Sequence, residues 1–372
     1  MTGAVTTHAA LLTAPGTAVR VVELGLAAPR QGEVRVRMSR SGVCLHDLNV
    51  LDGSLDTRCP VVLGHEGAGV VEAVGEGVTR VRAGDHVALS WAPYCGACEE
   101  CLRDLPHLCS RSWPPMLAGG LMDGTSRLSF GGATVYHYSF LSTFAEHAVV
   151  PERACVPVPK DVPLEVAALL GCAVTTGVCA VWRTAGVRPG DRVAVFGLGG
   201  TGLSAVMGAV AAGASEIAAI DRRDARLERA RELGATTTVR WQGDAESTAQ
   251  AVRDATGGVD YAFEAAGREA AIEAAFLSTR ARGAAVVMGL PRADVRIALP
   301  GMSLARIERR LLGSIYGSAR PDRDFPLILD LHRRGRLPLD RLISHRLPLE
   351  RLPEAFDLVR SGEATRAVIA LD

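Results

Sequence analysis

Hydrophobic and polar residues alternate along the first part of the chain in the pattern of short β-strands. The alternation is clear at residues 18–24 and 33–38, and further short strands with turn signals follow from residue 61 to residue 89. A side chain that points inward at every second position suits a strand with one buried face. We therefore expect a small, irregular β-barrel or sandwich here. Residues 91–140 show little periodicity, which predicts a long ordered loop after the first strands.

The pattern changes near Val158, after which helices and strands are expected in alternation. Residues 163–181 have the apolar spacing of a helix, and residues 192–196 form the apolar run of a buried strand. Later strands are expected at 216–220, 237–239, 259–263 and 283–289, and helices at 203–212 and 225–233. Repeated strand–helix units predict a parallel, doubly wound sheet. The end of the chain mixes a helix around residues 324–334 with short β-segments, which we expect to fold back onto the first part.

Length, charge and cysteine content narrow the class of protein. A chain of 372 residues exceeds what one hydrophobic core usually supports, so two domains are expected. The formal net charge is zero and the arginines are spread along the sequence, which gives no reason to expect nucleic acid or a membrane surface as a partner. The N-terminus lacks the features of a secretory signal, and no apolar run could span a bilayer, so we expect a cytoplasmic protein. Its nine cysteines would then be reduced, as metal ligands or buried apolar residues.

Four closely spaced cysteines form the sharpest chemical signal. They are Cys95, Cys98, Cys101 and Cys109. Four thiolates suit a closed tetrahedral zinc site, which stabilises a loop too polar to be held by burial. The alternative, a set of unrelated reduced cysteines, is disfavoured by this density and spacing. Because sulfur fills all four positions, none remains for water or substrate, and we predict a structural zinc.

A glycine-rich turn connects the expected strand at 192–196 to the helix that follows it. Its first glycine permits a tight turn, its second lets a pyrophosphate approach the backbone amides, and its third lets the helix pack on the strand. The positions expected to bind a dinucleotide are Gly197, Gly199, Gly200, Thr201 and Gly202. The same glycines could form a turn that binds nothing, but the strand-to-helix context favours the dinucleotide.

Asp221 ends the next expected strand, about twenty residues after the glycines. A carboxylate at this place can accept a hydrogen bond from the ribose 2′-hydroxyl and repel a 2′-phosphate, so NAD is favoured over NADP. Arg222 and Arg223 follow directly and could pair with a phosphate, which weakens that preference.

Cys44, His65 and Cys172 are candidate ligands of a second metal. They lie far apart in the sequence, so spacing alone does not join them, and each could be a buried, packed residue. Cys44 precedes polar residues at a turn, and His65 stands beside Glu66 in a run of glycines and small aliphatic residues. Two thiolates and one imidazole would leave one position for water or a substrate oxygen, as in catalytic zinc sites.

Taken together, these blocks make the chain similar to the zinc-dependent medium-chain alcohol dehydrogenases, essentially from end to end. The resemblance is carried by residues 64–69, 74–78, 84–87, the four-cysteine segment, 142–146, 171–172, the dinucleotide turn, 263–267 and 316–318. It implies an α/β fold class, with a GroES-like β-rich catalytic domain at 1–173 and 317–372 and a Rossmann coenzyme domain at 174–316. It also implies an active site between the domains, and a homodimer or homotetramer associated near residues 302–316.

Functional residues follow from the resemblance position by position. It implies a catalytic zinc in addition to the structural one, with Cys44, His65 and Cys172 as ligands and Glu66 as a nearby or alternating fourth ligand. Asp47 matches the carboxylate that orients His65. Three further positions match coenzyme contacts: Thr176 near the nicotinamide, Arg226 near the adenosine ribose and Arg366 on the pyrophosphate. The substrate pocket positions are Leu55, Trp91, Tyr138 and Leu290, residue types that in isolation more often belong to a core.

The chain departs from the family at the start of the proton relay. Two positions after Cys44 the family has Ser or Thr, whose hydroxyl touches the substrate oxygen, whereas this chain has His46. Asn49 occupies the place of a relay histidine in some relatives, and Leu45 that of a basic residue on the pyrophosphate. The imidazole of His46 could accept the proton directly, bind zinc, or fill the pocket and obstruct ordinary alcohols.

The function implied is the NAD- and zinc-dependent interconversion of an alcohol with an aldehyde or ketone. Residues 122–128 and 142–144 look more like the branch of class I alcohol and thiol-adduct formaldehyde dehydrogenases than the polyol branch, so oxidation of a hydroxymethyl thiol adduct is an alternative. His46 and Asn49 at the relay positions motivate a third hypothesis, a non-redox biosynthetic or ligand-binding protein.

Overall fold

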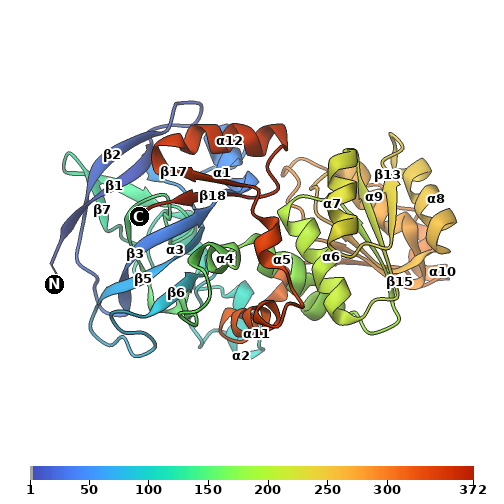
Figure 1. Cartoon of the computed structure of the whole chain (residues 1–372), viewed down its shortest axis with the longest axis horizontal. Helices are drawn as coiled ribbons and strands as arrows, with labels where there is room; N and C mark the ends of the chain where they lie inside the picture. The colour runs from blue at the N-terminus through green and yellow to red at the C-terminus, as the bar shows by residue number, and fades with distance from the viewer. Residues whose placement is uncertain (1–2) are drawn as a thin grey trace. The chain divides into compact units, whose positions relative to one another are not determined.

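The chain forms two compact units in the computed structural model, which describes residues 3–372. The first unit comprises Met1–Cys172, Arg320–Asp330 and Leu339–Asp372, and the second comprises Ala173–Ala319 and Leu331–Pro338. The boundary falls within the helix α11 (Pro321–Arg333) near the end of the chain. One unit is rich in β-strands and the other alternates strands and helices, which confirms the α/β fold class expected from the sequence (Figure 1).

The first unit contains a closed barrel and a second, seven-stranded sheet. The barrel strands are β1 (Val5–Leu12), β2 (Arg20–Leu26), β4 (Val61–Val62), β7 (Leu128–Phe130) and β8 (Ala133–His137). The other sheet consists of β3 (Glu33–Gly42), β5 (Glu66–Val74), β6 (His86–Leu89), β9 (His147–Pro151), β10 (Cys155–Pro157), β17 (His345–Pro348) and β18 (Ala367–Ala370). Its order is β10-β6-β5-β3-β18-β17, with β9 also paired to β3. Because β18 pairs with β3, the C-terminal strands do fold back onto the first part of the chain, as expected.

The loop expected over residues 91–140 is wrong in its second half, where β7 and β8 complete the barrel. These strands have only three and five residues, too few for an alternating pattern to be recognised in the sequence. Two short helices, α2 (Glu99–Leu102) and α3 (Trp113–Leu117), lie in the same segment. The other helices of this unit are α1 (Leu45–Leu51), α4 (Leu164–Leu169) and α12 (Leu352–Ser361).

The single helix expected over residues 163–181 is interrupted. α4 ends at Leu169, α5 (Ala173–Cys179) begins four residues later, and a π-helical turn, Ala180–Ala185, follows. A Cβ atom at Gly171 would lie 2.8 Å from the Cα atom of Glu66 and 3.0 Å from the carbonyl oxygen of Leu89. Glycine therefore allows the chain to pass closely over the start of β5, which places Cys172 beside that strand.

The second unit contains a six-stranded parallel sheet. Its strands are β11 (Arg192–Phe196), β12 (Glu216–Asp221), β13 (Thr237–Arg240), β14 (Val259–Glu264), β15 (Thr279–Val287) and β16 (Arg310–Gly313). Its other helices are α6 (Gly200–Ala212), α7 (Asp224–Glu232), α8 (Ala245–Thr256), α9 (Glu269–Ser278) and α10 (Gly301–Arg306). The order β13-β12-β11-β14-β15-β16 reverses direction between β11 and β14, the arrangement of a doubly wound sheet, in which helices cover both faces. This confirms the doubly wound sheet; α6 and α7 are visible beside it in Figure 1.

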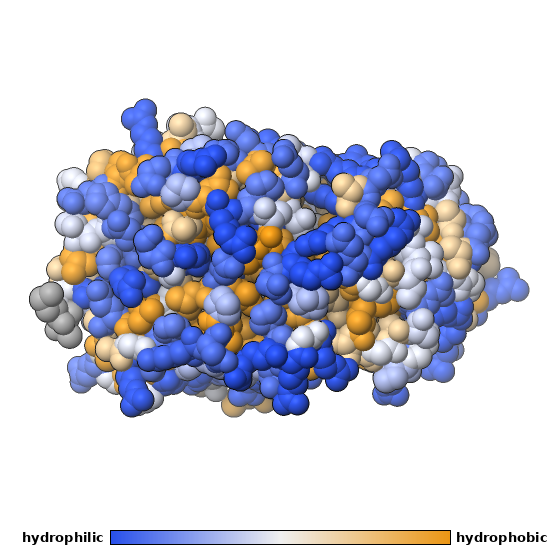
Figure 2. Space-filling view, viewed as in Figure 1, coloured by the Kyte–Doolittle hydropathy of each residue, from blue (hydrophilic) through white to orange (hydrophobic). Residues whose placement is uncertain are grey.

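Each unit buries a hydrophobic core of its own. In the first unit one group of apolar side chains fills the barrel region and a second lies under α12, while in the second unit the core lies between the sheet and its helices. Hydrophilic residues cover much of the face shown in Figure 2, with hydrophobic residues visible between them. Over residues 3–372, no helix combines the length and the apolar character needed to cross a membrane.

Candidate functional site

Four potential metal ligands converge in the first unit. They are Cys44, His46, His65 and Cys172, and one ligand atom of each lies within 4.8 Å of the others. The three residues that the resemblance groups as catalytic zinc ligands are buried, and the fold brings them together although they are far apart in the sequence. The fourth, His46, approaches with its Nδ1 atom 3.7 Å from the Sγ atom of Cys44.

Asp47 fixes the positions of two of these ligands. Its carboxylate is fully buried; one oxygen accepts the backbone N–H of Cys44 at 3.0 Å, and the other accepts that of Gly64 at 3.1 Å. The second oxygen also lies 3.2 Å from the Nδ1 atom of His65, which donates to it. The ring of His65 is thereby oriented with its Nε2 atom toward the cluster, the arrangement found for metal-bound histidines.

The donor set fits a zinc ion. Within residues 3–372 the Nε2 atom of His65 is buried and has no hydrogen-bond partner, which is rare for a polar atom unless a ligand completes it. Two cysteine sulfurs and imidazole nitrogen are the atoms that zinc prefers. Cys44 and Cys172 thus have the chemistry and the placement to hold such an ion together with His65.

The pKa values in the cluster reflect its crowding. A hydrogen bond with Cys172 lowers the pKa of Cys44 well below its ordinary value and raises the pKa of Cys172 well above it. Burial opposes protonation of His65, but the neighbouring Asp47 raises the pKa of this imidazole well above its usual range. Burial acts in the same way on His46, whose pKa is nevertheless raised, mainly by the charge of Cys44. The shifts thus arise from the mutual interactions of Cys44 and Asp47 with their neighbours, and because metal ligands must be deprotonated, metal binding at the cluster should depend on pH.

Glu66 and Arg366 form a buried ion pair beside the four ligands. The Nη2 atom of Arg366 donates to the Oε2 atom of Glu66, and both side chains are excluded from solvent. Burial raises the pKa of Glu66, although the charge of Arg366 opposes this. Glu66 was expected as a nearby or alternating ligand, and it lies beside the cluster without being one of its four members. Arg366, expected on a pyrophosphate, is directed to this carboxylate.

The second group of sulfurs lies in the four-cysteine lobe. The Sγ atoms of Cys98 and Cys101 are 3.4 Å apart, those of Cys98 and Cys109 3.7 Å, and those of Cys95 and Cys101 4.0 Å. Zinc–sulfur bonds of about 2.3 Å in a tetrahedron place sulfurs roughly 3.8 Å apart, so the lobe matches one ion. The backbone N–H groups of Ala97 and Cys98 donate to the sulfur of Cys95 at 3.4 and 3.2 Å, which fixes the position of this sulfur in the lobe.

In the glycine-rich turn, Gly197, Gly199 and Gly202 have the geometry expected for a dinucleotide-binding turn. Gly197 has φ of +87°, a conformation that favours glycine in a tight turn. A side chain at Gly202 would collide with the carbonyl oxygen of Gly197, so this position needs glycine for the helix to pack on the strand. At Gly199 an added Cβ would meet nothing within 4 Å, which leaves the backbone open to a ligand.

Asp221 ends β12 next to this turn. One carboxylate oxygen accepts the backbone N–H of Leu198 at 2.8 Å, and the other accepts those of Arg222 at 2.8 Å and Arg223 at 3.1 Å. The guanidinium of Arg226 lies 3.6 Å from the first oxygen. Arg222 and Arg223, whose charges weaken the preference for NAD, thus direct their backbone amides to Asp221, while their side chains are exposed.

The remaining predicted positions are distributed over both units. Tyr138 packs edge-on against His65 with ring centroids 5.5 Å apart, while Trp91 packs on Trp113 at 6.3 Å. Leu55 is partly exposed in the first unit; Leu290, exposed, and Thr176, buried on α5, belong to the second. The predicted pocket and coenzyme positions are therefore found in both units.

Glu264 is a buried acid whose placement the sequence did not reveal. It ends β14, beside the point where the strand order reverses, and accepts the backbone N–H groups of Ala266 and Gly267 at 2.7 Å. Burial raises the pKa of Glu264 to about 7. The sequence signal was the block 263–267, which supported the family resemblance without giving this residue a role.

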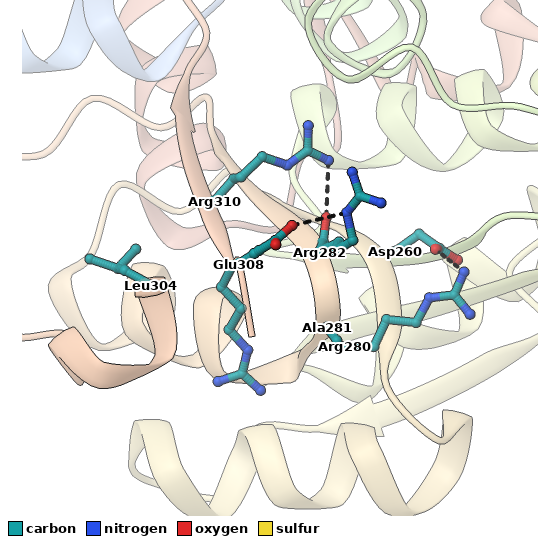
Figure 3. Close-up of a pocket in the computed structure, with 8 residues that line it drawn as sticks. Asp260, Arg280, Ala281, Arg282, Leu304, Glu308 and Arg310 are labelled. Atoms are coloured by element: carbon teal, nitrogen blue, oxygen red, sulfur yellow. Dashed lines mark hydrogen bonds and ion pairs between the residues drawn. The ribbon is translucent and has the colours of Figure 1, made fainter. Parts of the chain in front are cut away.

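A surface depression of about 600 Å³ on the second unit is lined by arginines from β15 and β16 (Figure 3). Asp260 pairs with Arg280, and Glu308 pairs with Arg282 at 3.2 Å. Arg310 donates to the carbonyl oxygen of Arg282 at 3.1 Å. Both carboxylates are therefore neutralised within the depression, which belongs to the last strands of the sheet and not to the glycine turn.

Comparison with known proteins gives matches over both parts of the chain. Residues 30–160 match the model of the alcohol dehydrogenase GroES-like domain, and residues 200–333 match that of the zinc-binding dehydrogenases. The structure of an alcohol dehydrogenase zinc-binding domain protein from Burkholderia ambifaria is similar with a TM-score of 0.95 and 35% identity, covering 99% of this chain and 100% of that one. Benzyl alcohol dehydrogenase from Acinetobacter calcoaceticus gives 0.93 and 30%, covering 99% of each chain. An alcohol dehydrogenase from Thermus sp. ATN1 gives 0.81 and 29%, covering 98% and 99%.

Proposed function

Because the chain belongs to the zinc-dependent medium-chain alcohol dehydrogenase family, we propose that it interconverts an alcohol with an aldehyde or ketone, with NAD as the hydride carrier. Membership makes it an oxidoreductase that uses a nicotinamide cofactor and zinc. The observation that carries the finer proposal is the buried, unpaired Nε2 atom of His65 between the sulfurs of Cys44 and Cys172.

We assign one zinc ion to this cluster and a second, structural one to the four-cysteine lobe. A zinc ion in the cluster would polarise the alcohol oxygen and lower its pKa. The chain's own residues do the positioning: Asp47 holds the ring of His65 and the backbone of Cys44, and Tyr138 covers one edge of that ring. Beside the ligands, the carboxylate of Glu66 is paired with the guanidinium of Arg366, and both side chains are buried.

NAD is the coenzyme we propose, bound with its pyrophosphate at the open backbone of Gly199. The carboxylate of Asp221 is anchored at the end of β12 by three backbone amides, so its negative charge cannot easily turn away from a 2′-phosphate. Repulsion of that phosphate favours NAD over NADP. Thr176 and Arg226 would contact the nicotinamide and adenosine ends, as the family resemblance implies.

Aromatic primary alcohols are the substrates to examine first. The similar protein from Acinetobacter calcoaceticus is a benzyl alcohol dehydrogenase, and Tyr138 places an aromatic ring next to the cluster in this chain. A flat aromatic substrate gains from edge-to-face contact with such a ring.

The proposal is tested by NADH formation from benzyl alcohol, aliphatic alcohols and hydroxymethyl thiol adducts, with zinc-loaded protein and with protein treated with a chelator. We expect turnover with an aromatic alcohol that is lost with the metal and is faster with NAD than with NADP. Turnover only with the thiol adduct would replace the substrate class. Failure with every alcohol and aldehyde, despite two bound zinc ions and bound NADH, would favour a non-redox role and contradict the proposal.

We further propose that the chain forms a homo-oligomer through the edge of its parallel sheet. Among the residues that the structure describes, β16 pairs on one side only, with β15, and its other side is an open edge of the sheet. Exposed apolar side chains lie on and near this strand, at Met302, Leu304 and Leu311. A second copy of the chain would cover both features.

A further inference from the structure

We propose that the Nδ1 atom of His46 is the fourth protein ligand of the metal held by Cys44, His65 and Cys172. The cluster would then be a set of two sulfurs and two nitrogens, in which a histidine occupies the position that open catalytic sites leave to water. The inference rests on the proposed function, since it concerns the same metal, and it assigns to His46 one of the roles that its sequence position leaves open.

The distance between His46 and Cys44 is that of two ligands of one ion. Zinc bonds of about 2.3 Å to sulfur and about 2.0 Å to nitrogen, arranged as a tetrahedron, place neighbouring donors roughly 3.3–3.8 Å apart. The Nδ1 atom of His46 lies 3.7 Å from the Sγ atom of Cys44. All four donors lie within 4.8 Å of one another, and the rings of His46 and His65 have their centroids 6.2 Å apart, inclined by 46°.

The local backbone explains why His46 reaches the cluster. Cys44 is the N-cap of α1, so His46 is the second residue of this helix and projects from its first turn. Asp47 ties the start of the helix to Cys44 and Gly64, and the hydroxyl of Tyr138 donates to the carbonyl oxygen of His46 at 3.5 Å. The ring nitrogen that faces Cys44 thus comes from a segment held on both sides.

The neighbouring carboxylates are not grouped with these donors. Glu66, the ligand that the family resemblance suggested for the fourth place, pairs through its Oε2 atom with Arg366, and its buried Oε1 atom, which has no hydrogen-bond partner within residues 3–372, is not among the four donor atoms. Both carboxylate oxygens of Asp47 already accept hydrogen bonds, from Cys44, Gly64 and His65. Over residues 3–372, His46 is the only further Cys, His, Asp or Glu side chain grouped with the three expected ligands.

This assignment suggests what His46 does at the position where the family has Ser or Thr. A histidine in the fourth place closes the site against water in the absence of substrate. A substrate oxygen would have to take that place, and the released imidazole would remain two residues from Cys44, where relatives have the hydroxyl that begins the proton relay. His46 would therefore be both a gate and a base in reach of the alcohol proton.

Nuclear magnetic resonance of cadmium-substituted protein tests the assignment without relying on activity. The full chain is produced with isotope-labelled histidine and loaded with the spin-active isotope of cadmium, and the couplings between cadmium and ring nitrogens are counted. We expect one cadmium signal coupled to two histidines, through Nδ1 of His46 and Nε2 of His65, and a second signal, from the four-cysteine lobe, coupled to none. His46→Ser should lose one coupling, while His8→Ser, a change at an exposed histidine, should keep both.

The possible outcomes separate the two proposals. A cadmium signal coupled to His65 alone in the unmodified protein overturns the role of His46 and leaves the zinc-dependent function standing. Absence of any cadmium signal with histidine coupling contradicts both the ligand assignment and the metal site of the proposed function. Because the decisive count is made on the unmodified chain, the result does not depend on whether the His46→Ser variant folds.

Discussion

At the scale of single residues, buried polar groups in the first unit are each matched to specific partners. Asp47 has no exposed surface and yet receives hydrogen bonds from two backbone amides and one imidazole. Three donors compensate for the loss of water around the carboxylate, and the same three contacts place Cys44 and His65. One acid residue therefore links helix α1 to the segment before β5 and prepares the candidate metal site.

His137 is a buried residue that should make stability depend on pH. Its Nε2 atom accepts the backbone N–H of Arg127 at 3.2 Å, and burial, reinforced by the charge of Arg127, lowers its pKa to about 3. In the unfolded chain a histidine titrates near pH 6.5. Because the folded-state pKa is the lower one, this residue contributes stability above pH 6.5 that is progressively lost as the pH falls toward 3.

We expect His137→Gln to reduce this pH dependence. The glutamine carbonyl can still accept from Arg127 but takes up no proton, so the melting temperature of the variant should fall less between pH 7 and pH 4.5 than that of the unmodified protein. Thermal unfolding in a series of buffers measures this, with His8→Gln, at an exposed histidine, as the control. If the melting temperatures of all three proteins fall equally with pH, the protonation of His137 does not differ between the folded and the unfolded state, and the prediction is wrong.

At the scale of elements, a glycine between two helices determines where Cys172 lies. Gly171 lies so close to the start of β5 that a larger residue would not fit. A Cβ atom there would collide with backbone atoms of Glu66 and Leu89. The break between α4 and α5 and the position of Cys172 thus have the same structural cause.

Gly171→Ala should therefore disturb the metal site as well as stability. We expect a loss of about 1–3 kcal/mol in the free energy of unfolding and weaker zinc binding at the cluster, because Cys172 must move with the displaced backbone. Denaturant unfolding and zinc analysis after dialysis measure the two effects. Gly301→Ala is the matched control, since a Cβ there meets nothing within 4 Å. A Gly171→Ala protein that keeps both stability and zinc would refute the packing argument.

The sequence predicts those elements whose pattern is long enough to be read. β11 and β14 lie inside a parallel sheet and appear as apolar runs, whereas β7 and β8 are too short for any period to emerge. The four-cysteine lobe is recognisable because its ligands are local. Cys44, His65 and Cys172 could be joined only through a family resemblance, because no local pattern links residues brought together by the fold.

The pairing of Glu66 with Arg366 was outside the reach of sequence reasoning. The two residues are 300 positions apart, and each had been given a different partner, the metal and the pyrophosphate. Only the pairing of β18 with β3 beside β5 shows that the two side chains meet. For His46 the sequence left three roles open, zinc binding among them, and only the start of α1 shows that its ring lies with the other three potential ligands.

At the scale of the whole molecule, association through β16 is the property that the edge strand suggests. The strand is partly paired, and Leu311 on it is exposed at 36% while Met302 nearby is exposed at 71%. We expect the protein to sediment as a dimer or tetramer, and Leu311→Glu to shift it toward the monomer, since a charge in the interface stays solvated only in the free chain. Analytical ultracentrifugation measures this. A monomeric unmodified protein, or a Leu311→Glu variant of unchanged mass, would contradict association through this edge.

The central claim is that Cys44, His65 and Cys172 hold the zinc ion at which the alcohol reacts. The most direct measurement is the zinc content and NAD-linked alcohol oxidation of Cys172→Ala, compared with Cys155→Ala, a buried cysteine outside both clusters. We predict that Cys172→Ala retains one zinc ion per chain, in the four-cysteine lobe, and loses more than about 100-fold in kcat, while Cys155→Ala keeps two zinc ions and its activity. A Cys172→Ala protein that still holds two zinc ions and oxidises alcohols at the original rate would contradict the account.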